Sequence, residues 1–163
     1  MTIEGKFRPE LLWLLLRDLA GQESCAEIPV RGTSMCPTLL PGDRVRLVPV
    51  AAAQVRIGDV LIRMGRAGPI IHRLVGWWPT RDGWRMLTMG DSARQLDPPL
   101  GTDDLTGRVL ARVRGGEVQR LDGTRMRVRG YCRAVASLGV GVTAEVWNRG
   151  RRVARGWARW RED

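Results

Sequence analysis

Residues 31–43 read RGTSMCPTLLPGD and carry the strongest chemical signal in the chain. Ser34 follows a Gly-Thr pair, and Gly32 allows the backbone to approach a neighbouring group closely. Pro37 and Pro41 restrict the chain after the serine. A nucleophilic serine needs such a rigid and exposed setting, and it also needs a base, because a free hydroxyl is a poor nucleophile at neutral pH. The stretch therefore indicates either a nucleophilic serine or an ordinary turn that contains one.

Short β-strands are predicted around this stretch. Apolar and β-branched runs separated by glycine turns predict strands over residues 44–50, 59–64, 69–78, 84–88, 107–114 and 117–121. The GRAG sequence at 65–68 and the Gly-Gly pair at 115–116 predict two of the connecting hairpins. Few segments of helical length interrupt the pattern. We therefore expect one mainly β body over residues 28–121.

The segment before this body, residues 1–27, predicts a short helix and a lead-in. PELLWLLLRDLA at 9–20 begins with a proline, which the first turn of a helix tolerates, and Gly21 follows it. The helix either packs on the body or lies at a membrane interface. Its apolar run, residues 11–16, is too short for a secretory signal or a spanning helix. The three cysteines show no CxxC spacing and favour a reducing compartment, so we expect a cytoplasmic protein.

The segment after the body, residues 122–163, is basic. Residues 125–163 hold 10 arginines and 3 acidic residues, so they supply most of the net charge of +10. Turn chemistry at 122–130 marks the boundary, and residues 130–161 have helical spacing. Their Trp and Arg side chains suit peripheral contact with the inner membrane face, but an amphipathic helix on the body fits equally. RNA is a weaker alternative, because the body shows no nucleic-acid motif.

Several segments together resemble the type I signal peptidases and their soluble relatives, including the LexA-like self-cleaving proteins. GTSMCPTLLPGD resembles the nucleophile box of these families. The other matching segments follow in the same order: IGDV (57–60), IHRLV (71–75), TMGDSARQLD (88–97) and LTGRVLARVRG (105–115). The resemblance implies a coiled, partly open β-barrel. It also implies a serine endopeptidase that removes a leader or signal segment from a precursor polypeptide.

The resemblance and the residues together choose a base for Ser34. Many relatives use a Ser–Lys pair, but Lys6, the single lysine, lies before the nucleophile box. The matching strand position holds His72, the single histidine. Free imidazole titrates near pH 6.5 and can act as a base at neutral pH. The chain thus resembles the archaeal and endoplasmic-reticulum signal peptidases, which use Ser, His and Asp; the alternative is a structural histidine.

A third group would orient His72, and two aspartates are candidates. Asp97 matches the later acid of the family pattern and is the preferred choice, whereas Asp91 belongs to the Gly-Asp box and shapes its loop in this interpretation. The resemblance assigns the oxyanion to the backbone N–H of Ser34. Many relatives add a hydroxyl two residues before the nucleophile, but Gly32 stands there, so Thr33 is the candidate substitute.

Other classes of function are disfavoured by the sequence. One histidine and scattered acids give no ligand spacing for zinc, and no phosphate-binding loop of the Walker type is present, so no metal or cofactor is expected. A self-cleaving regulator would need a DNA-binding domain before the body, and only its Ala20–Gly21 bond speaks for it. A non-catalytic binding module that uses the basic segment remains the main alternative to a peptidase.

Overall fold

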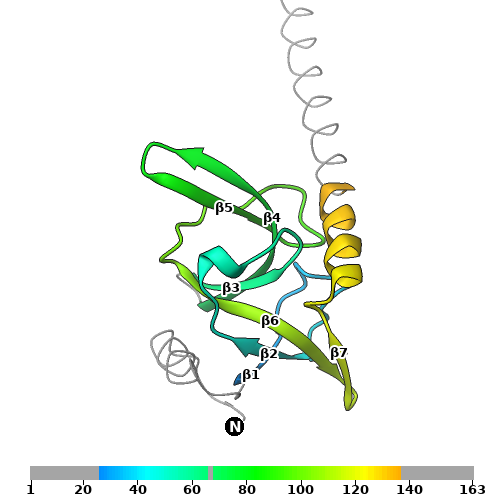
Figure 1. Cartoon of the computed structure of the whole chain (residues 1–163). Coiled ribbons are helices and arrows are strands. Elements are labelled where there is room, and N and C mark those ends of the chain that lie inside the picture. Colours follow the sequence, from blue (N-terminus) through cyan, green and yellow to red (C-terminus); the bar gives the residue numbers. More distant parts are fainter. Residues whose placement is uncertain (1–25, 66–67, 137–163) are drawn as a thin grey trace, which may run out of the picture.

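The computed structural model describes residues 26–65 and 68–136. These residues form an antiparallel sheet that does not close into a barrel, with a helix of residues 124–136 beside it (Figure 1). The strands are β1 (Ala26–Pro29), β2 (Arg44–Val48), β3 (Val60–Gly65), β4 (Gly68–Thr80), β5 (Gly83–Met89), β6 (Leu105–Arg114) and β7 (Glu117–Arg120), and a 3-10 helix η1 (Ala52–Gln54) precedes β3. The expectation of a mainly β body is confirmed.

Strand β6 lies between β2 and β3, and so joins β1 and β2 to β3, β4 and β5. The strand order is β1-β2-β6-β3-β4-β5, and β7 also pairs with β6. The start of β6 pairs with β3, through partners such as Leu61 and Arg108, and its end pairs with β7. Its other edge pairs with β2, where the register shifts between Arg46 and Leu47. Such irregularities bend a strand and let the sheet coil around its core.

The core lies on both sides of β3. Val60 and Ile62 of β3 pack in one buried cluster with residues of β1, β2 and the loop after β1, whereas Leu61 packs in a second cluster with Leu74 and Met86. Because successive side chains of a strand point to opposite faces, β3 is buried on both. This explains why its first three residues, 60–62, are all apolar rather than alternating.

The two predicted hairpins, β3–β4 and β6–β7, are present, and β4 is longer than the strand predicted at 69–78. Strands β6 and β7 join at Gly115 and Gly116, whose φ angles of 55° and 87° favour glycine. Strands β3 and β4 pair from Val60–Arg73 to Gly65–Gly68. Strands β4 and β5 continue as a long arm that projects from the rest of the sheet (Figure 1). His72 lies at the base of this arm, within the paired region of β3 and β4.

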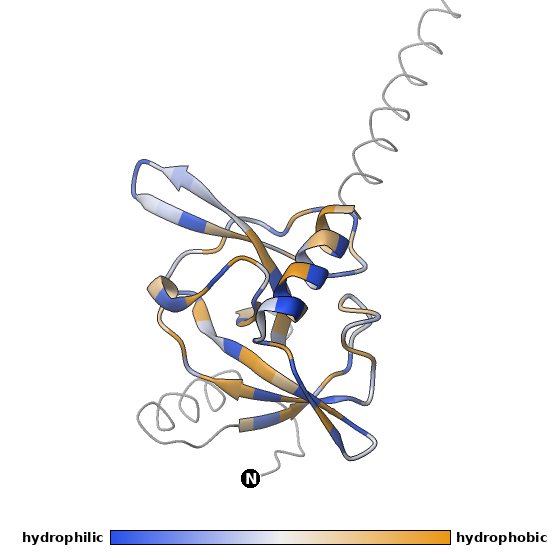
Figure 2. Cartoon of the chain, turned by 45° about the vertical axis from the view of Figure 1, so that its right-hand side comes forward, coloured by the Kyte–Doolittle hydropathy of each residue, from blue (hydrophilic) through white to orange (hydrophobic). Residues whose placement is uncertain are grey.

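The helix corrects the expectation of turn structure at 122–130, because it begins at residue 124. One charged residue of this segment has a partner in the β body: Arg127 forms an ion pair with the buried Asp59, next to the start of β3, with Nε and Oδ1 2.9 Å apart. A Cβ atom at Gly130 would lie 2.2 Å from Cζ of Arg73, so the helix touches the sheet there. Hydrophilic and apolar residues alternate along the helix (Figure 2). The sequence looked like a turn because its binding partners lie far away along the chain.

Two expectations lie outside the described residues. The predicted helix at 9–20 falls within residues 1–25, together with the Ala20–Gly21 bond. Residues 137–163 contain most of the segment predicted to contact a membrane. Within residues 26–65 and 68–136, no helix combines the length and apolar character needed to cross a bilayer.

Candidate active site

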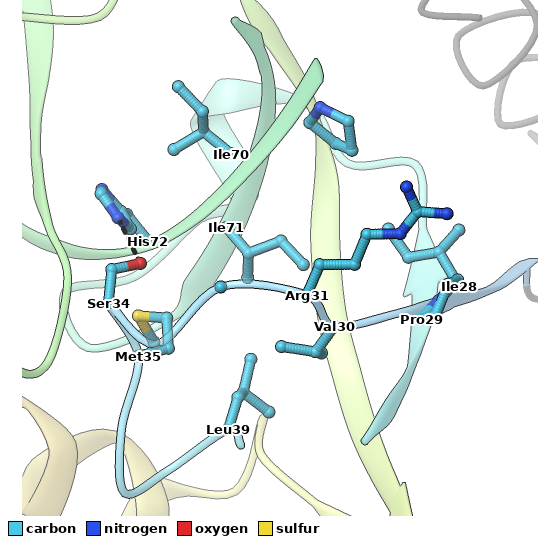
Figure 3. Close-up of a pocket in the computed structure, with 12 residues that line it drawn as sticks. Ile28, Pro29, Val30, Arg31, Ser34, Met35, Leu39, Ile70, Ile71 and His72 are labelled. Carbon is cyan, nitrogen blue, oxygen red and sulfur yellow. Dashed lines mark hydrogen bonds between the residues drawn. The ribbon is translucent and has the colours of Figure 1, made fainter. Parts of the chain in front are cut away.

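Three of the predicted residues meet at the base of the β4–β5 arm. Ser34 lies in the loop between β1 and β2 and is exposed. His72 lies on β4, and Asp97 lies in the connection between β5 and β6. Ser34 and His72 point toward one another (Figure 3). The nearest two of these residues are 25 positions apart in the sequence, so only the folded sheet brings them together.

Both ring nitrogens of His72 have partners. Nε2 lies 3.0 Å from Oγ of Ser34, and Nδ1 lies 2.6 Å from Oδ2 of Asp97. An ionised carboxylate can only accept hydrogen bonds. Nδ1 therefore carries the ring proton and donates a hydrogen bond to Asp97. Nε2 is then the acceptor for the Ser34 hydroxyl. This tautomer leaves a lone pair directed at the proton that a nucleophilic serine must lose.

The surroundings of Asp97 keep its carboxylate charged. Burial alone would raise the pKa of Asp97, but hydrogen bonds from His72 and Thr88 and the charges of His72 and Arg63 lower that pKa below its usual value. Thr88 Oγ1 donates to Oδ2 of Asp97 over 2.7 Å, and the Asp97 amide donates to the Thr88 carbonyl over 2.9 Å. Thr88 therefore holds both the backbone and the carboxylate of Asp97 in place.

Asp91, the other candidate for orienting His72, lies in a different environment. Its two oxygens accept hydrogen bonds from Nε and Nη2 of Arg73, each over 2.7 Å. The hydroxyl of Thr38 also donates to Asp91. All three side chains are buried. Asp91 thus binds the middle of the nucleophile loop to β4, which agrees with a role in shaping that loop.

The loop of Asp91 also supports Ser34 directly. The Ser92 amide donates to the Ser34 carbonyl over 2.9 Å, and Ser92 Oγ lies 2.9 Å from the carbonyl oxygens of both Thr33 and Ser34. A Cβ at Gly90 would lie only 2.5 Å from the Ser34 carbonyl oxygen. Glycine is therefore required at position 90 for the two loops to pack this closely.

The backbone turns sharply at Ser34. The Cys36 amide donates to the Thr33 carbonyl over 2.9 Å, which is the i to i+3 bond of a β-turn with Ser34 at its second position. Thr33 is exposed beside the nucleophile. Gly32 has open space around it, since a Cβ there would meet no atom within 4 Å. The Thr33 hydroxyl and the Ser34 amide therefore stay the candidate donors to an oxyanion.

A pocket of about 380 Å³ opens beside Ser34 and His72. Its walls come from β1, from the segment that follows it and from the start of β4 (Figure 3). The lining is mainly apolar and includes Ile28, Val30, Met35 and Ile71; among the described residues that line it, Arg31 is the one with a permanent charge. The site can therefore receive an apolar group next to the serine oxygen.

Neither a protein-family model nor a curated protein sequence matches this chain significantly. The described residues also contain no group of three or more His, Cys, Asp or Glu side chains that could hold a metal ion.

Two supporting residues were missed in the sequence. Thr88 ends the strand predicted at 84–88, and nothing in the sequence indicates that its hydroxyl binds Asp97. Ser92 follows Asp91 in the TMGDSARQLD segment, and the sequence assigns no contact to it. A strand-end threonine nine residues before an aspartate is not a recognisable signal, because their contact depends on how the intervening loop closes.

Proposed function

We propose that the chain is a serine endopeptidase resembling the type I signal peptidases, with Ser34 as nucleophile, His72 as general base and Asp97 as the residue that orients His72. The observation that carries the proposal is the position of His72 between Ser34 Oγ at 3.0 Å and Asp97 Oδ2 at 2.6 Å. A purely structural histidine has no need of an exposed serine hydroxyl at one ring nitrogen and a charged carboxylate at the other.

The chemistry follows from this arrangement. His72 Nε2 takes the proton of the Ser34 hydroxyl as Oγ attacks the scissile carbonyl carbon, and the imidazolium formed is stabilised by Asp97. The carbonyl oxygen becomes an oxyanion, for which the Ser34 amide and the Thr33 hydroxyl are the candidate donors. His72 then gives its proton to the leaving amine, and the C–N bond breaks. Water, deprotonated by His72, hydrolyses the acyl-enzyme and restores Ser34.

The pocket supports a polypeptide substrate. Its apolar lining lies directly beside Ser34, so it can hold a side chain of the residue whose carbonyl is attacked or of a residue close to it. We therefore propose that the substrate is a precursor polypeptide from which a leader or signal segment is removed. Contact with a membrane through residues 130–161 stays a prediction.

The test compares protein N-termini by mass spectrometry between cells that express the wild-type chain and cells that express Ser34→Ala. We expect a small set of N-termini to disappear in the variant, and these would name the substrate and its cleavage preference. Thr80→Ala is the matched control, because it removes an exposed hydroxyl at the far end of the β4–β5 arm. Identical N-termini in all three strains, at equal expression, would reject the peptidase and favour a binding module.

A further inference from the structure

A second pocket lies across β4 from the candidate active site. His72 and Arg73 are neighbours on β4, so their side chains point to opposite faces of the strand. His72 lines the pocket beside Ser34, whereas Arg73 lines another pocket, of about 230 Å³. Thr38 of the nucleophile loop also lines this second pocket, together with residues of β6, β7 and the helix. We call it the arginine pocket.

The walls of the arginine pocket are strongly basic. Among the residues that the structure describes, five arginines line it and no aspartate or glutamate does; the arginines are Arg73, Arg112, Arg114, Arg129 and Arg133. Arg112 and Arg114 stand two residues apart on β6 and therefore share a face. Arg129 and Arg133 stand four residues apart on the helix and share a face of it. Strand and helix thus present guanidinium groups to one enclosed space.

Two of these arginines form ion pairs with aspartates that do not themselves line the pocket. Asp91 accepts two hydrogen bonds from Arg73, and Asp43 accepts two from Arg114, over 2.6 and 2.7 Å. Arg112 uses one N–H for the Thr38 carbonyl, over 2.7 Å. Within residues 26–65 and 68–136, neither Arg112 nor Arg129 forms an ion pair with a carboxylate. The pocket therefore holds more positive charge than its neighbouring carboxylates balance.

We propose that the arginine pocket binds a phosphate group carried by a small molecule or by a lipid. Like charges that converge in a concave site repel one another, and a bound anion removes that cost. A guanidinium group presents paired donors that match two oxygens of a phosphate. Because a terminal phosphate carries close to two negative charges and three acceptor oxygens, it can be shared between the β6 side and the helix side of the pocket. A single carboxylate offers only two oxygens and one charge.

The site is independent of the proposed peptidase chemistry. Arg73 contacts the pocket from the opposite face of β4 to His72, and the hydrogen bonds of Arg73, Arg112 and Arg114 within the described residues go to groups other than Ser34, His72 and Asp97. Phosphate should therefore bind equally well to the Ser34→Ala chain. Failure of the peptidase test and failure of phosphate binding are separate results.

The experiment titrates inorganic phosphate into the full chain by calorimetry and measures the melting temperature at the same concentrations, with chloride at equal ionic strength as reference. A ligand that binds only the folded state raises the melting temperature as its concentration rises. The test variant is Arg112→Gln/Arg129→Gln, and Arg129→Gln alone serves if the double variant folds poorly, because Arg129 is exposed. Arg125→Gln is the matched control: Arg125 is exposed on the same helix and does not line the pocket.

We expect Arg125→Gln to bind phosphate as the wild type does and the double variant to bind about tenfold more weakly or worse, since each lost charge-assisted hydrogen bond accounts for roughly a factor of ten. All variants keep the arginines of residues 137–163, so a difference between them reports on the pocket. Equal binding by the double variant and Arg125→Gln would overturn the proposal. So would a response to phosphate no larger than the response to chloride.

Vesicles distinguish the two sources of the phosphate. Phosphatidylcholine vesicles with and without phosphatidic acid are mixed with the same variants. Binding that requires phosphatidic acid, is competed by inorganic phosphate and is lost in the double variant identifies a lipid headgroup. Phosphate binding without any difference between the vesicles identifies a soluble phosphate compound. Binding of single-stranded RNA that is lost in the double variant, with no binding of phosphate, would instead reject the proposal in favour of a nucleic-acid site.

Discussion

Two aspartates bind to neighbouring residues of β4, and the two pairs have opposite characters. Asp97 contacts His72 where 16% and 15% of their side-chain surfaces are exposed, next to an exposed serine. Asp91 contacts Arg73 where these fractions are 0% and 2%. One residue of the strand thus presents a ring nitrogen to the pocket beside an exposed serine, and the next carries a permanent charge that is buried against Asp91. Alternation along a single strand thus separates His72, which takes part in the proposed chemistry, from Arg73, which supports the nucleophile loop.

We expect substitution of Ser34 or His72, which line the pocket of the candidate active site, to reduce activity more than the other substitutions do. For His72→Ala and Ser34→Ala we expect cleavage of the identified substrate to fall by about 10⁴-fold or more, because removal of either the base or the nucleophile disables the whole unit. The fold should be retained, since Ser34 is exposed and His72 lies at the wall of a pocket. Purified variants are compared by single-turnover cleavage and thermal unfolding. Near-normal turnover by His72→Ala would eliminate His72 as the base.

Asp97→Asn sharpens the assignment of the orienting residue. An amide can donate to Nδ1 and thereby favour the tautomer that places the proton on Nε2, where it blocks acceptance from Ser34. We expect a loss of about 10³–10⁴-fold in kcat with the fold retained. Thr88→Val, which removes the hydroxyl that binds Asp97, should lower kcat by a smaller factor. If Asp97→Asn cleaves at the wild-type rate, the 2.6 Å contact with His72 has no part in the chemistry.

Substitution of the buried Arg73–Asp91 pair should instead lower the free energy of unfolding. Arg73→Ala leaves Asp91 as a charge in the interior without its main partner, and breaking a buried pair in this way costs about 3–5 kcal/mol of unfolding free energy. The double variant Arg73→Met/Asp91→Leu should recover part of this loss, since it removes both charges. Urea unfolding of the three chains gives the comparison. A double variant that is less stable than Arg73→Ala would show that the pair itself stabilises the loop.

The sequence predicted the parts of this comparison that depend on local pattern. Glycine turns and apolar alternation located the β6–β7 hairpin and the strand of His72, and the order of motifs selected Ser34, His72 and Asp97, which the structure places in contact. The sequence predicted helix from residue 130, which is confirmed for residues 130–136, but it did not predict that the helix begins at residue 124. Its Arg127 contacts Asp59, its Arg133 contacts Thr38 and its Gly130 packs against Arg73; such partners are set by tertiary packing rather than by neighbouring residues.

The pH dependence of the cleavage rate is the smallest of these effects, and it distinguishes protonation of His72 from protonation of Asp97. The pKa of Asp97 is lowered in the folded chain, so its stabilising contribution is present above the ordinary carboxyl pKa and is lost only as the pH falls through the lowered value. Between about pH 5 and pH 8, Asp97 therefore stays charged, and a fall in rate there cannot come from its protonation. We expect the rate of the proposed peptidase to fall as the pH is lowered from about 8 to about 5, because protonated imidazole cannot accept the Ser34 proton. Thermal unfolding at each pH is the control for the fold. A rate that stays flat from about pH 5 to about pH 8 would require a base other than His72.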